Sequence, residues 1–102
     1  MLPDEPVILP MYKQYLSIKE KHPECVILIG LDDLYETYCE DAVSVSEILG
    51  IPITRHFYNK GNPEYAEVDA TVFRKCFLDS YLPMLIKAKK RVAICESVLT
   101  ND

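Results

Sequence analysis

The sequence predicts an α/β (α+β) domain in which a small mixed β-sheet packs against about three helices. Two kinds of pattern alternate along the chain. Short apolar runs rich in β-branched residues are typical of strands, and longer stretches with apolar residues every three or four positions are typical of amphipathic helices. No internal repeat, linker or low-complexity tract divides the 102 residues, so we expect one domain.

The first two predicted elements are a helix and a buried strand. The helix begins at Pro10, whose fixed φ suits a helix start, and ends at His22, because the following proline pushes that residue out of the α region. Residues 1–8 carry acidic residues and prolines and are expected to form a loose lead-in. The run Cys25–Ile29 is apolar over the length of a buried strand, so we expect cover on both of its faces.

A second helix is predicted from Asp33 to Leu49. Asp33 is a good N-cap residue, and Glu36, three positions later, completes a pattern close to a capping box. Gly50 and Pro52 are typical of a helix end. The apolar residues on one face of this helix are Tyr35, Tyr38, Ala42, Val45 and Leu49.

The second half of the chain is predicted to contain a hairpin, a helix and a last strand. In chain order the elements are a strand at residues 51–58, a turn at 59–63, a returning strand at 64–68, a helix at 69–88 and a strand at 91–97. Pro83 interrupts the helical pattern and is expected to kink that helix or split it in two.

The composition is that of a folded domain and excludes several function classes. Hydrophobic residues make up 49% of the chain, yet no apolar run approaches the roughly 20 residues of a membrane span. The four cysteines contain no Cys-x-x-Cys pair and read as reduced packing residues, which favours a cytoplasmic protein. Neither histidine lies at metal-ligand spacing from a cysteine or carboxylate, and no catalytic set can be assembled. We therefore expect no metal, no cofactor and no enzymatic activity.

The formal net charge is −5, so any contact with nucleic acid must come from a local basic patch or a larger assembly. Arg55, His56 and Lys60 are the basic residues of the predicted hairpin and are candidate phosphate contacts, although a solvated hairpin tip is the simpler account. The densest basic run, at residues 87–91, follows the last predicted helix. Lysines there complement the helix dipole, and we favour that structural role.

Four segments carry a resemblance to a known family. They are Pro-Met-Tyr-Lys-Gln-Tyr-Leu at residues 10–16, His-Pro-Glu at 22–24, Asp-Leu-Tyr-Glu at 33–36 and Val-Ala-Ile-Cys-Glu at 92–96. In this order they resemble the N-terminal mismatch-recognition domain of the MutS family of DNA mismatch repair proteins. The resemblance implies that fold and a non-enzymatic role in mismatch recognition. The partners it implies are duplex DNA, including mismatched DNA, bound weakly, and MutS-type or other repair proteins.

The third segment carries the site that the resemblance implies. In the family it reads Asp-Phe-Tyr-Glu, where the phenylalanine wedges beside the mispaired base and the glutamate hydrogen-bonds that base. These roles fall on Leu34 and Glu36. Leucine can act as an apolar wedge but has no π-face, and stacking on a base is worth about 1–3 kcal/mol, so weakened binding is expected. Without the resemblance, Glu36 reads as a capping-box residue and Leu34 as a core or helix-start residue.

Other departures from the family pattern point in the same direction. The family has glycine where Asp32 stands and again where Lys89 stands, and five carboxylates fall within residues 32–41. The Gly-Ile-Pro-Tyr-His segment of the family is not recognisable at residues 72–76. The 102 residues contain no phosphate-binding loop, so we expect no ATPase activity. The alternative function is a protein-interaction module that retains this fold without binding DNA.

Overall fold

The computed structural model describes the backbone of residues 5–58 and 66–98, and the side chains of residues 11–55 and 68–98. Its elements are α1 (Glu5–Lys21), β1 (Cys25–Leu31), β2 (Leu34–Tyr38), α2 (Cys39–Leu49), β3 (Thr54–Tyr58), β4 (Ala66–Arg74), the 3₁₀ turn η1 (Lys75–Phe77), α3 (Leu78–Lys87) and β5 (Arg91–Glu96). The five strands form one sheet in the order β3-β4-β2-β1-β5. Only β1 and β5 pair in parallel, so the sheet is mixed, as predicted.

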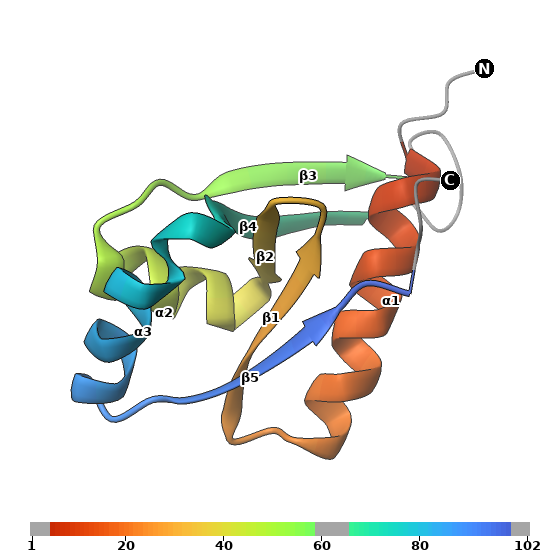
Figure 1. The fold of residues 1–102 in the computed structure, drawn as a ribbon. Helices are drawn as coiled ribbons and strands as arrows, with labels where there is room; N and C mark the ends of the chain where they lie inside the picture. The colour runs from red at the N-terminus through yellow and green to blue at the C-terminus, as the bar shows by residue number, and fades with distance from the viewer. Residues whose placement is uncertain (1–4, 59–65, 99–102) are drawn as a thin grey trace.

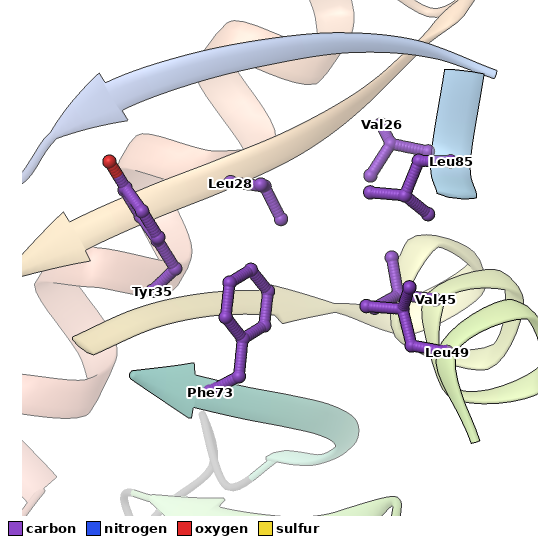
Figure 2. Packing of buried hydrophobic residues seen from close by; sticks show 7 residues of the cluster. All are labelled: Val26, Leu28, Tyr35, Val45, Leu49, Phe73 and Leu85. Atoms are coloured by element: carbon purple, nitrogen blue, oxygen red, sulfur yellow. The ribbon is translucent and has the colours of Figure 1, made fainter. Parts of the chain in front are cut away.

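Helices cover both faces of this sheet, with α1 on one side and α2 and α3 on the other (Figure 1). The core on the side of α2 and α3 contains Val26, Leu28, Tyr35, Val45, Leu49, Phe73 and Leu85, whose side chains point toward one another (Figure 2). The core on the side of α1 contains Met11, Tyr15, Ile27, Ile29, Tyr38 and Ala70. Successive residues of β1 alternate between the two cores, which confirms that this strand is covered on both faces.

The first helix is longer than predicted at its start. It begins at Glu5, so residues 5–8 are helical and not a loose lead-in. Pro6 can occupy the first turn of a helix because the backbone N–H groups there have no partner within the helix. The helix ends at Lys21, directly before His22, as the following proline predicts. Residues 1–4 lie outside the described part of the chain.

The predicted Asp33–Leu49 helix is wrong over its first turns. Leu34–Tyr38 form β2, so neither Asp33 nor Glu36 belongs to a capping box, and α2 begins at Cys39 with no side-chain cap. The strand prevails because β2 hydrogen-bonds to β1 on one side and to β4 on the other. All five residues of the predicted apolar stripe are buried, but Tyr35 and Tyr38 lie on opposite faces of the sheet.

The predicted helix at residues 69–88 is also wrong over residues 69–74, which continue β4, and α3 covers only Leu78–Lys87. The helix continues through Pro83 and is not split there. The hairpin is confirmed by the antiparallel pairing of β3 and β4, although β3 begins only at Thr54 and the predicted turn lies outside the described residues. The last strand is confirmed as β5. In the described part of the chain, no helix is long and apolar enough to cross a membrane.

Candidate functional site

Leu34 lies at one end of the central strands. It is the first residue of β2, directly after a two-residue turn formed by Asp32 and Asp33, and it pairs with Leu31 on β1 and with Arg74 on β4. Its side chain is half-buried and belongs to neither hydrophobic core. An apolar side chain in this position can be presented to a ligand without opening the core.

The turn before Leu34 requires a left-handed backbone. Asp32 has a positive φ of 55°, whereas the φ of Asp33 is not positive. These two signs match a type II′ turn, and the first central position of such a turn favours glycine. The end of β4 holds this turn in place. The backbone N–H of Lys75 donates to the carbonyl of Asp33 at 2.8 Å, and the Arg74 guanidinium lies 3.8 Å from the Asp33 carboxylate. The turn and the end of β4 therefore form one local unit.

Glu36 lies on the same face of the sheet as Leu34, because alternate residues of a strand share a face. Two strand residues span about 7 Å, so an apolar side chain and a carboxylate lie close together at this end of the sheet, on the side of α1. The Glu36 side chain is partly buried, and its Oε1 accepts a hydrogen bond from the Tyr38 hydroxyl at 2.8 Å. The arrangement places an apolar side chain and a hydrogen-bond acceptor next to each other.

Arg74 is a cationic neighbour of Leu34 that the sequence analysis missed. The two residues are paired across β2 and β4 and share a face, and the Arg74 side chain is 66% exposed. The residue was missed because the sequence was interpreted as helical there. The alternation of Ala70, Val72 and Arg74 on one side of a continued strand is the signal that would have identified it.

The basic residues of the predicted hairpin do not all share this face. Arg55 pairs in register with Asp69, and the two side chains form an ion pair with an Nε–Oδ1 distance of 2.7 Å. Asp69 and Phe73 are an even number of residues apart on β4, so Arg55 lies on the side of α2 and α3, opposite to Glu36. The side chain of His56 and all of Lys60 lie outside the described residues.

Asp41, one of the five carboxylates in residues 32–41, is not a surface charge. It is 5% exposed and accepts hydrogen bonds from the Tyr15 hydroxyl at 2.9 Å, the Ile27 backbone N–H at 3.1 Å and the Lys19 ammonium at 3.0 Å. Burial, and then the charge and hydrogen bond of Asp41, raise the pKa of Tyr15 well above its ordinary value. Asp41 therefore anchors α1 to β1 and α2. Because its charge is buried and paired, the electrostatic potential near Leu34 is less negative than the count of five carboxylates in residues 32–41 suggested.

The cysteines behave as packing residues with one exception. Cys25, Cys39 and Cys95 are partly buried against the core on the side of α1, whereas Cys76 is exposed, and all four are free thiols. Within residues 5–58 and 66–98, no group of three or more His, Cys, Asp or Glu side chains could hold a metal ion.

The chain matches a known protein family. The family model described as MutS domain I matches residues 9–102. The chain is similar to proteins named DNA mismatch repair protein MutS: 45% identical over 92 residues (90% of the chain) in Phocaeicola vulgatus, 44% over 95 residues (92%) in Porphyromonas gingivalis, and 47% over 88 residues (86%) in Bacteroides thetaiotaomicron. The matched region spans 10% of each of these relatives. The chain therefore belongs to the MutS domain I family.

Proposed function

We propose that this chain is a non-enzymatic recognition domain for mismatched DNA, in which Leu34 wedges beside the mispaired base and Glu36 hydrogen-bonds that base. The observation that carries the proposal is that both residues lie on one face of β2, at the end of the sheet beside the exposed Arg74. An apolar wedge, a hydrogen-bonding group and a nearby cation are the parts that a minor-groove binder needs. Membership of the MutS domain I family supports this class of ligand.

The proposal includes weak DNA binding by the chain alone. Leucine lacks the stacking energy of an aromatic wedge, which is about 1–3 kcal/mol. The net charge of −5 and the exposed carboxylates of Asp32 and Asp33 repel the phosphate backbone. We therefore propose that the domain works in the cytoplasm within a MutS-type or other repair assembly, which supplies further DNA contacts. Arg55, His56 and Lys60, the basic residues of the hairpin that the sequence predicts, are proposed as a second, weaker phosphate contact.

The test is fluorescence anisotropy with a G·T-mismatched and a matched duplex at low salt. Leu34→Phe restores a stacking ring and should tighten binding to the mismatched duplex about tenfold. Glu36→Ala should reduce the preference for the mismatch. Ile86→Phe is the matched control, because Ile86 is 58% exposed on α3, on the other side of the sheet, and its replacement should leave binding unchanged. Absence of binding by every variant at tens of micromolar would contradict direct DNA recognition.

A second candidate is a protein-interaction module that keeps the fold without binding DNA. The observation that favours it is a set of exposed apolar side chains on η1, α3 and β5, namely Phe77, Met84, Ile86 and Ile94. Exposed apolar side chains gathered on neighbouring elements are typical of protein contacts. The candidate requires a specific partner that copurifies with the chain after nuclease treatment, together with no DNA binding in the anisotropy assay.

A further inference from the structure

The side chain of Lys75 reaches across the end of the sheet, on the side of α2 and α3. Lys75 directly follows β4, and its ammonium lies 5.2 Å from the centroid of the Tyr35 ring on β2. The same ammonium forms an ion pair with the Glu96 carboxylate on β5, with an Nζ–Oε1 distance of 2.7 Å. Attraction to the ring and to the carboxylate both favour this one conformation of the side chain. We call the Lys75 side chain and its ion pair with Glu96 the Lys75 strap.

Gly30 on β1 leaves the space that the strap crosses. It pairs with Tyr35 on one side and with Glu96 on the other. A Cβ added at Gly30 would lie 2.6 Å from Glu96 Oε2, 2.8 Å from Lys75 Cε and 2.9 Å from Lys75 Nζ, too close for separate heavy atoms. Gly30 does not have a positive φ, so its backbone does not require glycine. The strap is therefore the reason that a side chain does not fit there.

The backbone of Lys75 holds the turn that carries Leu34. Its N–H donates to the carbonyl of Asp33 at 2.8 Å. The ion pair between Arg74 and Asp33 is longer, at 3.8 Å, and both of its side chains are exposed, so it holds the turn only weakly. The Lys75 side chain and N–H belong to one residue, so anchoring the side chain on β5 also fixes the direction of the N–H.

We propose that Lys75 is a positioning residue, and that its strap to Glu96 across Gly30 fixes the β1–β2 turn and with it Leu34. The order of the turn follows from contacts within this chain. The effect of the strap on DNA binding rests on the proposed function, in which Leu34 meets the mispaired base.

Amide hydrogen exchange of the residue-75 N–H, measured by NMR, tests the strap without DNA. Gly30→Ala places a Cβ against the flexible ends of two side chains, so it should displace them and leave the fold intact. Glu96→Gln removes the charge that holds the ammonium. We expect the residue-75 N–H to exchange about fivefold faster in both variants, because the contacts that anchor this residue are lost.

Two controls separate a local effect from a general loss of structure. Glu20→Gln makes the same change as Glu96→Gln at the end of α1, next to the start of β1 and away from the turn, and should leave the exchange unchanged. The Ile27 N–H donates to a buried carboxylate in the core and should exchange at the wild-type rate in every variant. Lys75→Met keeps the backbone N–H but removes the ammonium, so Glu96→Gln should add nothing in that background.

The DNA arm of the test uses Gly30→Ala in the Leu34→Phe background, because this change alters no charge. The preference for a G·T-mismatched over a matched duplex should fall about threefold, since a mobile turn must be ordered on binding. Unchanged exchange of the residue-75 N–H in Gly30→Ala and Glu96→Gln would overturn the strap and leave the proposed function standing. Faster exchange with an unchanged mismatch preference would overturn the positioning of Leu34 for DNA. If no variant binds DNA, the proposed function and that positioning are both overturned, and the exchange rates still decide whether the strap fixes the turn.

Discussion

Two residues with a left-handed backbone stand where the resembled family has glycine. Asp32 has a φ of 55° in the β1–β2 turn, and Lys89 has a φ of 70° after α3. A non-glycine residue pays a steric cost there of about 1–2 kcal/mol, and aspartate pays less than lysine because its short side chain tolerates this conformation. We expect Lys89→Gly to raise the free energy of unfolding by about 1 kcal/mol and Asp32→Gly to raise it by less, as measured by urea denaturation.

Gly50 supplies the reverse control for this prediction. It ends α2 with a φ of 72°, and a Cβ added there would meet no atom within 4 Å. Gly50→Ala therefore tests the backbone cost without a packing cost, and it should lower the free energy of unfolding by about 1 kcal/mol. If Gly50→Ala lowers the free energy of unfolding but Lys89→Gly leaves it unchanged, the backbone at Lys89 carries no steric cost and the prediction is contradicted.

Tyr15 should make stability depend on pH in the alkaline range. Burial and Asp41 raise its pKa in the folded chain, whereas in the unfolded chain the Tyr15 hydroxyl has its ordinary pKa of about 10. Above that pH the unfolded chain loses the proton first, so the stabilisation is complete below about pH 10 and falls by up to about 1.4 kcal/mol per pH unit above it. In urea denaturation, the difference in the free energy of unfolding between the wild type and Tyr15→Phe should shrink between about pH 9 and pH 11. An advantage that stays constant over this range would contradict the raised pKa.

At the scale of elements, α3 contains a proline in its interior. Pro83 removes the N–H that would donate to the carbonyl of Asp79, and its side chain is exposed, so little packing depends on the ring. Pro83→Ala restores the hydrogen bond at the cost of a more flexible unfolded chain. We expect a net gain of about 1 kcal/mol in the free energy of unfolding, measured by urea denaturation. A loss of stability would show that the ring contributes packing that outweighs the missing hydrogen bond.

Which residues are buried could be predicted from the sequence better than which element carries them. Tyr35 and Tyr38 were correctly predicted to be buried. Their spacing of three was interpreted as one face of a helix, but it also places two residues on opposite faces of a strand that is covered on both sides. Local spacing cannot distinguish these cases, because the strand depends on hydrogen bonds to β1 and to β4, which lies more than thirty residues later in the chain. The same long-range pairing explains why Arg74 was missed.

The candidate site was predictable only in part for the same reason. Leu34 and Glu36 were identified from four consecutive residues, and the strand keeps them on one face. Arg55 was grouped with them because it is basic and close in sequence to a turn. Its face depends on the register of β3 with β4, and that register pairs it with Asp69, on the other side of the sheet from Glu36.

At the scale of the whole molecule, the sheet separates the cations into distinct surfaces. Arg74 lies beside Leu34, Arg55 lies on the opposite face, and Arg91 begins β5 next to Cys25, at the far end of β1 from the β1–β2 turn. A duplex at the Leu34 face can therefore reach one of these three arginines, and a chain with net charge −5 has no general attraction for it. The dependence of DNA affinity on salt should report which of the three contacts phosphate.

We expect a shallow salt dependence, since each phosphate contact contributes about 0.9 to the slope of log K against log salt concentration. Arg74→Gln should reduce the magnitude of that slope by about 0.9. Arg55→Gln should reduce it by less, because Asp69 already engages the guanidinium at 2.7 Å. Arg91→Gln removes the same charge at the distant end of the sheet and should leave the slope unchanged. If Arg74→Gln and Arg91→Gln change the slope equally, binding is governed by net charge and not by the Leu34 face.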